Sequence, residues 1–161
     1  MRDYQAIGAT WYLQGQQKHV LTTGKHASAT LFGAVAPATG QIVITEADQA
    51  TAETFQTFLE TLRATFPDKT VHLVLDNAKI HHAKILQPYL EDHPELDLRF
   101  LPPYSPNLNN TERLWKWLRE KVILNTYFPD LEAIRRAIAR FRDYLTTVPE
   151  EIQSRLGRVA T

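Results

Sequence analysis

Cysteine is absent from the 161-residue chain, and so are long apolar runs. Without cysteine there is no disulfide, thiolate zinc site or cysteine nucleophile, and a reducing compartment is allowed. No uninterrupted apolar run approaches the roughly 20 residues that a membrane helix needs, and the N-terminus lacks the pattern of a signal peptide. Charged residues make up 22% and hydrophobic residues 43%, which is typical of one soluble globular domain. We therefore expect a cytosolic protein.

The net charge is zero, but the charges are unevenly distributed along the chain. Residues 1–112 carry 8 Lys and Arg against 12 Asp and Glu, a net charge of −4, whereas residues 113–161 carry 10 against 6, a net charge of +4. An acidic part that could hold metal, followed by a basic part that could meet phosphate, is compatible with a nucleic-acid enzyme. Chance distribution over solvated helix faces explains the same numbers more simply, so charge alone decides nothing.

Short β-strands dominate the first half of the chain. Runs rich in β-branched and aromatic residues are separated by glycines, and two of them flank the turn Ala36–Gly40, which predicts a hairpin. The apolar run Val71–Leu75 is typical of a strand buried on both faces. The predicted strands are Thr10–Leu13, Lys18–Leu21, Thr30–Val35, Gln41–Thr45, Val71–Leu75 and Leu98–Leu101.

Apolar residues at helical spacing predict four helices. The first starts near Asp48–Thr51 and ends before Pro67, and its apolar face is Phe55, Phe58, Leu59, Leu62 and Phe66. A weaker helix at about Ala83–Leu90 contains Pro88, which we expect to kink it. Two more follow at about Asn110–Leu124 and Asp130–Leu145, and residues after Pro149 form a short helix or a frayed tail. This order predicts an α/β domain whose mixed sheet has an antiparallel meander, then parallel strands, with helices on its flanks.

Asp76 directly follows the apolar run Val71–Leu75. At the carboxyl end of a strand in an open α/β sheet, side chains emerge from the core and ligands bind. Taken alone, Asp76 is explained equally well as a turn residue, because Asp-Asn is also favourable turn chemistry.

Glu112 lies in the first turn of the helix that begins at about Asn110. A glutamate there often does no more than favour the positive end of the helix dipole. The preceding loop is unusual, however: it has three prolines that restrict the backbone and three asparagines that can cap the helix, namely Pro102, Pro103, Pro106, Asn107, Asn109 and Asn110. Such a loop would place Glu112 with little freedom. The buried face of this helix is expected to hold Leu114, Trp117, Leu118, Val122 and the aliphatic part of Lys121.

Two stretches of this sequence resemble motifs of the mariner-like DDE transposases, and more closely those of their bacterial insertion-sequence relatives. The family's second motif is an aspartate that ends an apolar strand, followed by Asn and a downstream His, and Asp76, Asn77 and His81 match it. The third is Pro-Tyr-Ser-Pro-x-Leu-Asn-x-x-Glu-x-x-Trp, matched from Pro103 to Trp115. The 35 residues between Asp76 and Glu112 are close to the family's spacing.

The resemblance extends to Trp11 and Gly15, and to the Phe-Gly-Ala stretch at Phe32, so that it covers roughly residues 4–145. It departs from the family in two places. Asn110-Thr111 stands where the family often has Pro-Ile. The family's first catalytic aspartate is expected a dozen or more residues before Trp11, where Asp3 is the one acidic residue and lies too near. We therefore expect residues 1–148 to be an RNase H-like catalytic domain without its first strand, preceded in the family by a helix-turn-helix region, and residues 149–161 to be a C-terminal tail.

The resemblance implies phosphoryl transfer with two Mg²⁺ or Mn²⁺ ions, because hard divalent cations take oxygen ligands and a pair of ions about 4 Å apart can serve attacking and leaving oxygens. Asp76 and Glu112 would be catalytic metal ligands within about 8 Å of each other, with Asp3 a doubtful third. Contacts to DNA would come from Arg113, Lys116, Arg119, His81 and Asn77. The alternatives are ordinary solvated helix residues for the basic side chains and exposed or capping roles for His81 and His82. Trp117 is expected in the core, and Trp115 in the core or against DNA.

The resemblance implies a bacterial, nucleoid-associated transposase that cleaves and transfers DNA strands, acts on transposon ends and target DNA, self-associates as a dimer and needs no small-molecule cofactor. Two alternatives remain open. The chain could be a catalytically inactive remnant that binds DNA or oligomerises with an intact transposase. It could also be a generic RNase H-like nuclease, although such an enzyme is not expected to carry the signature from Tyr104 to Trp115.

Overall fold

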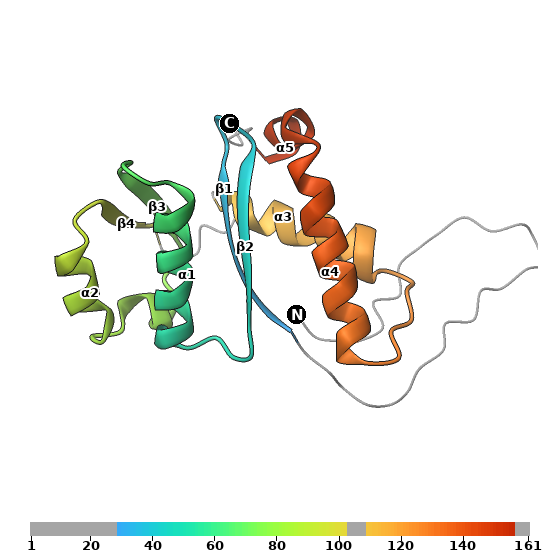
Figure 1. The fold of residues 1–161 in the computed structure, drawn as a ribbon, viewed down its shortest axis with the longest axis horizontal. Coiled ribbons are helices and arrows are strands. Elements are labelled where there is room, and N and C mark those ends of the chain that lie inside the picture. Colours follow the sequence, from blue (N-terminus) through green and yellow to red (C-terminus); the bar gives the residue numbers. More distant parts are fainter. Residues whose placement is uncertain (1–28, 103–108, 157–161) are drawn as a thin grey trace, which may run out of the picture.

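The computed structural model describes residues 29–102 and 109–156. These residues form an α/β structure in which the hairpin of β1 and β2 separates α1, with the β3–β4 pair, from α3, α4 and α5 (Figure 1). The predicted strands at Thr10–Leu13 and Lys18–Leu21 lie outside the described residues. The elements are β1 Thr30–Ala36, β2 Gln41–Ala47, α1 Ala52–Thr65, β3 Val71–Leu75, the 3₁₀ turn η1 Lys79–His82, α2 Leu86–Asp92, β4 Leu96–Phe100, α3 Asn110–Leu118, the π-helical turn η3 Arg119–Ile123, α4 Leu131–Thr146 and α5 Pro149–Leu156.

The β1–β2 hairpin is the central layer and is buried on both faces. The strands are antiparallel and close on the pair Ala36 and Gln41, around the predicted turn. Phe32 and Val43 face a cluster that contains α1, β3, α2 and β4, whereas Ile44 belongs to a second cluster built by α3, α4 and α5. The hairpin therefore joins two apolar cores.

Helix α1 forms where its apolar spacing predicts it. Thr51 caps it: its side chain accepts a hydrogen bond from the Thr54 backbone N–H, and the Thr54 side chain accepts one from the Thr51 backbone N–H, a reciprocal arrangement that satisfies two otherwise unpaired donors. The predicted face is buried at its four helical positions. The helix ends at Thr65, just before Pro67, and Asp68 then adopts a positive φ of 59° that ends the helical path.

Strands β3 and β4 run parallel and pair only with each other within the described residues, as do β1 and β2. The predicted mixed sheet is therefore present as two separate pairs. The expectation that β3 is buried on both faces is wrong, because Leu73 and Leu75 are buried whereas Val74 is 52% exposed. Strand β4 begins two residues earlier than predicted, at Leu96.

Pro88 does not kink a helix. The predicted helix from Ala83 is instead a 3₁₀ turn, Lys79–His82, followed by α2 from Leu86. Pro88 thus lies in the first turn of α2, where its missing N–H would have no helical partner in any case.

The helix that carries Glu112 changes its pitch after Leu118. The Leu124 N–H bonds to the Arg119 carbonyl at 2.8 Å, five residues back, so the turn is wider than an α-helical one. This shift rotates Ile123 into the core and leaves Lys121 exposed. The expectation that the aliphatic part of Lys121 lies on the buried face is therefore wrong, because it assumed an unbroken α-helical period.

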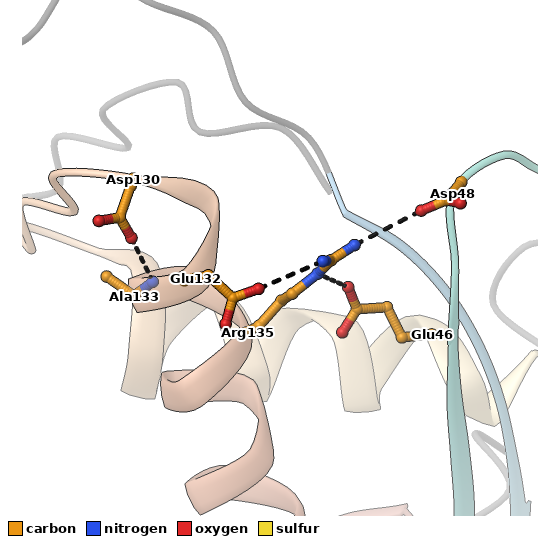
Figure 2. A network of polar contacts seen from close by, with 6 residues as sticks. All are labelled: Glu46, Asp48, Asp130, Glu132, Ala133 and Arg135. Atoms are coloured by element: carbon orange, nitrogen blue, oxygen red, sulfur yellow. Dashed lines mark hydrogen bonds and ion pairs between the residues drawn. The ribbon is translucent and has the colours of Figure 1, made fainter.

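Helix α4 starts at the predicted signal and is joined to β2 by an arginine. The Asp130 side chain accepts a hydrogen bond from the Ala133 N–H at 2.7 Å and caps the helix. Arg135 points across to the hairpin and contacts Glu46 and Asp48 while also bonding Glu132 in its own helix (Figure 2). These contacts fix the position of the start of α4 against the end of β2.

Residues after Pro149 form α5 up to Leu156, so of the two alternatives for this stretch the helix is present. Its residues Ile152 and Leu156 are each 1% exposed and belong to the core shared with α3 and α4. The helix also reaches the tip of the hairpin, where Gln153 Nε2 donates to the Ala38 carbonyl at 2.6 Å. Gly40 has φ +73°, and a Cβ there would lie 2.2 Å from the Pro149 carbonyl oxygen.

Candidate active site

Asp76 extends from the end of β3 and its side chain is 57% exposed. One carboxylate oxygen accepts a hydrogen bond from the Ala78 N–H at 3.1 Å, the turn role that its sequence context allows. His81 lies beneath it: Nδ1 is 3.2 Å from the Asp76 carboxylate Oδ1 and 3.2 Å from its backbone oxygen. The carboxylate is therefore oriented by its neighbours while remaining open to solvent.

Asn77 and His81 hold the ends of two strands in place. Asn77 Nδ2 donates to the Leu101 carbonyl, and the Leu101 N–H bonds to the Leu75 carbonyl at 2.8 Å, so the residues that follow β3 and β4 are tied together. The His81 ring packs 4.5 Å from that of Phe55, and its side chain is only 10% exposed. His82 is exposed and stacks on Phe100 with centroids 4.1 Å apart.

These contacts were not predicted from the sequence. Helical spacing identifies Phe55 only as an apolar residue of a helix, and neither spacing nor composition indicates that it supports His81. That Asn77 and His81 contact DNA stays a prediction.

Glu112 lies in the first turn of α3 and is exposed. Asn109 caps the helix by accepting from the Thr111 N–H at 3.0 Å and from the Thr111 hydroxyl. The Glu112 N–H bonds to the Asn109 carbonyl at 3.1 Å. The polar pair Asn110-Thr111, which departs from the family's pattern, is thus accommodated in a capped helix start that projects the Glu112 side chain outward. Of the loop before it, Pro103–Leu108 lie outside the described residues.

A cavity of about 410 Å³ lies between the two carboxylate-bearing segments. Asp76 lines it on one side, and Asn109, Asn110 and Thr111 line it on the other; Glu112 is the next residue of the chain and is not itself among the lining residues. Residues 29–102 and 109–156 contain no group of three or more Asp, Glu or His side chains close enough to hold one metal ion. The separation of about 8 Å expected for the two carboxylates stays a prediction.

The remaining predicted site residues lie on α3 and η3, except for one that lies outside the described residues. Trp115 packs against Gly33 of β1 and joins the core, and Trp117 is 3% exposed, which confirms core packing for both. Lys116 of α3 and Arg119 of η3 are exposed, and Lys116 is 4.0 Å from Glu120. Arg113 of α3 is half-buried, and Asp3 lies outside the described residues. A DNA contact by Arg113, Lys116 and Arg119 stays a prediction.

The fold is RNase H-like: Asp76 follows a parallel strand and lines the cavity, and Glu112 lies in the first turn of the helix whose start lines the other side of that cavity. Two solved assemblies share the fold. The Mos1 strand transfer complex gives a TM-score of 0.54 at 17% identity over 96% of this chain and 51% of that chain. The Mos1 mariner paired end complex with Mn gives 0.57 at 18% identity over 91% and 48%.

Sequence relatives narrow the class to one family. Residues 1–135 match the family model described as DDE superfamily endonuclease. An uncharacterized 39 kDa protein of insertion element IS630 from Shigella sonnei is 31% identical over 144 residues, 89% of this chain and 42% of that protein. Protein y4pE/y4sA of Sinorhizobium fredii is 32% identical over 107 residues, 66% of this chain and 76% of its own length.

The chain belongs to the DDE superfamily endonucleases, as a transposase-family member of the mariner and IS630 type. It spans less than half of the IS630 protein and about half of each Mos1 chain. Within the described residues, no helix is both long and apolar enough to cross a membrane.

Proposed function

We propose that this chain contributes two carboxylates, Asp76 and Glu112, to a catalytic centre that cleaves and joins DNA strands with divalent metal ions. The observation that carries the proposal is the cavity that Asp76 enters from the end of β3 and whose opposite rim is the start of α3. Two segments separated by 35 residues, each with an exposed carboxylate, thus converge on one open space.

The chemistry of these side chains fits a hard divalent cation. Carboxylate oxygens are the ligands that Mg²⁺ and Mn²⁺ prefer, and few protein ligands are needed because water and phosphate oxygens complete the shell. When bound, a pair of such ions makes a water or a 3′-hydroxyl a better nucleophile and stabilises the departing oxygen. Asp76 and Glu112 would hold them, and the other polar contacts of Asp76, to Ala78 and His81, would fix the direction of its carboxylate.

DNA is the proposed partner. Two solved structures that share this fold are the Mos1 strand transfer complex and the Mos1 transposase paired-end complex with the left transposon end. In this chain, the exposed Lys116 and Arg119 follow Glu112 on the same helix, where positive side chains could contact phosphates without reading sequence. Self-association and a nucleoid location belong to the same proposal.

Calorimetric titration of MnCl₂ into the purified 161-residue chain tests the metal site. We expect saturable binding that Asp76→Asn and Glu112→Gln each weaken by at least about tenfold, since each removes an anionic ligand without changing size. Asp92→Asn is the matched control for an exposed aspartate on another element. Glu150→Gln is the control for Glu112, because Glu150 also lies in the first turn of a helix and loses the same dipole interaction.

Equal losses in the site and control variants would mean that binding is non-specific and would overturn the proposal. Unchanged Mn²⁺ affinity in both Asp76→Asn and Glu112→Gln would do the same. A second assay follows nicking of DNA that carries the element's own ends. With Mn²⁺ and this chain alone we expect none, because two of three carboxylates leave the ions poorly held; strand cleavage would show that Asp3 or another group completes the set.

A further inference from the structure

Two exposed rings stack on each other at the edge of the β3–β4 pair that carries Asp76. His82 ends the turn η1 and Phe100 ends β4, and their ring centroids lie 4.1 Å apart with an angle of 28° between the ring planes. We call these two rings the stacking pair. Both residues are exposed, and Phe100 keeps 40% of its surface accessible. The stacking pair therefore presents aromatic surface to solvent.

The register of the two parallel strands places the stacking pair next to the candidate active site. Phe100 is the partner of Leu75, and Asp76 is the residue that follows Leu75 in the chain. Neighbouring strands lie about 4.8 Å apart and successive residues of a strand about 3.3 Å apart, so the backbones of Phe100 and Asp76 are separated by roughly 6 Å. The hydrogen bond from Asn77 Nδ2 to the Leu101 carbonyl ties the two segments together at this point. A ligand that reaches Asp76 is thus also within reach of the stacking pair.

The apolar core does not account for the stacking pair. Leu96 and Leu98 lie on the same face of β4 as Phe100 and pack in the cluster with α1 and α2, whereas Phe100 belongs to neither apolar cluster of the described residues. In η1, Ile80 packs against that same cluster, whereas His82 lies at the surface against Phe100. The last residue of each segment thus contributes a ring to the surface rather than to the interior.

The segment around His82 is basic, although residues 1–112 together carry a net charge of −4. Residues 77–90 contain two lysines and two histidines but no aspartate or glutamate. Lys79 and Lys84 lie on either side of His82 in the chain, and both are exposed. Lysine side chains contact phosphates without reading sequence, and exposed aromatic rings stack on nucleobases. Flat aromatic surface next to positive charge fits a nucleic-acid strand, which carries both a base and a phosphate on every nucleotide.

We propose that the stacking pair binds an unpaired nucleobase of the DNA strand that reaches Asp76, with Lys79 and Lys84 on the adjoining phosphates. In a duplex each base is already stacked between its neighbours, so a surface ring stacks most readily on a base that is unpaired. Stacking of this kind depends little on which base is present. The inference rests on the proposed function and adds a substrate preference to it, because DNA with unpaired nucleotides next to the reacting phosphate is then favoured over a continuous duplex.

Short DNA hairpins with and without an overhang test the proposal. The blunt hairpin is compared with the same stem carrying a few unpaired thymidines, made in 3′ and 5′ versions, with one 2-aminopurine among them whose fluorescence falls when it stacks. Each is titrated with the full 161-residue chain in CaCl₂, because manganese itself quenches fluorescence. We expect one overhang version to bind at least about fivefold more tightly than the blunt hairpin and its 2-aminopurine to be quenched. Phe100→Leu and His82→Leu should each remove most of this preference and of the quenching, whereas Phe100→Trp should retain both.

Two further variants serve as controls. Tyr127→Leu is matched to Phe100→Leu, because Tyr127 is 38% exposed but lies between η3 and α4, and it should change neither affinity nor quenching. Lys84→Gln separates charge from stacking: it should weaken both hairpins equally and leave the quenching of the bound overhang unchanged. Equal affinity of the unaltered chain for blunt and overhanging DNA would overturn the inference, as would an unquenched 2-aminopurine or an equal loss in Tyr127→Leu. If Phe100→Leu does not fold, as judged by circular dichroism, His82→Leu decides the outcome.

Failure of the stacking pair and failure of the catalytic centre give different results. Overhang binding that depends on Phe100, together with Mn²⁺ binding that Asp76→Asn and Glu112→Gln leave unchanged, would support the stacking pair and overturn the proposed function. Mn²⁺ binding that depends on Asp76, together with overhang binding that Phe100→Leu leaves unchanged, would overturn the stacking pair and leave the proposed function standing. A change in sedimentation of the Phe100→Leu chain with no effect on DNA binding would mean that the rings meet a second copy of the chain, and it would also overturn the inference.

Discussion

The contact between Gly33 and Trp115 gives a stability prediction whose sign can be worked out. A Cβ at residue 33 would lie 2.6 Å from Trp115 Cη2 and 2.9 Å from Cζ2, far inside normal carbon contacts. Replacing glycine by alanine where the backbone permits it normally stabilises a protein by about 0.4–1 kcal/mol. Forcing an extra carbon into a packed site costs about 1–3 kcal/mol, and the indole is held by the surrounding core. The steric cost is the larger, so we expect Gly33→Ala to destabilise the chain by about 1–2 kcal/mol.

Urea unfolding followed by tryptophan fluorescence and circular dichroism measures this difference, and the melting temperature should fall by roughly 2–8 °C for a chain of this size. Trp115→Phe provides the matched test because a phenyl ring lacks the two atoms that the new Cβ would meet. In the Trp115→Phe background, Gly33→Ala should therefore cost less, with a coupling of at least about 0.5 kcal/mol in the double-mutant cycle. A stabilised Gly33→Ala variant, or additive effects of the two changes, would refute the packing argument.

Two further predictions concern the core and the pH dependence of stability. Ile152→Ala should destabilise the chain by about 2–5 kcal/mol in urea unfolding, because the Ile152 side chain is 1% exposed in the core. The control variant Glu150→Ala, in the same helix, should change the stability little. Equally small effects of the two variants would show that α5 is not part of the folded core. The hydrogen bond from Arg99, and then the one from His72, lowers the pKa of Asp97. The ionised Asp97 therefore contributes stability that is fully present above the unfolded pKa of about 3.9 and is lost as the pH falls through the folded pKa. Asp97→Asn should thus flatten the loss of stability in acid. An unchanged dependence of the melting temperature on pH, measured from pH 6 to pH 2, would contradict this.

The elements that could be predicted from the sequence are those fixed by local patterns. Helix α1 has an apolar stripe at helical spacing and Thr51 as its cap, and α4 begins at Asp130 for the same reasons. The β1–β2 hairpin follows from its turn residues. The errors came where tertiary contacts overrule the local pattern: the π turn after Leu118 places Ile123 rather than Lys121 in the core.

The exposure of Val74 is a second case, because an apolar run shows that a strand suits burial but not whether a neighbouring strand is present. For the candidate site, the motifs identified Asp76 and Glu112, and the structure adds the cavity between their segments. The supports of Asp76 could not be predicted. The contact of His81 with Phe55 joins residues from different elements, and no periodicity within one element encodes it.

The attachment of α5 to the hairpin tip affects how the chain can be assembled. The Ala38 carbonyl accepts a hydrogen bond from the side chain of Gln153, which lies 115 residues later in the chain. A ribosome adding about 5–20 residues each second takes roughly 6–23 seconds to span that interval, and throughout that time the tip of the hairpin lacks the helix that covers it. Binding of a chaperone to the nascent hairpin would therefore be concentrated in this interval and end once α5 docks. A shortened chain ending before Pro149 would keep α3 and α4 against the hairpin but would leave the Ala38 carbonyl permanently without its Gln153 partner.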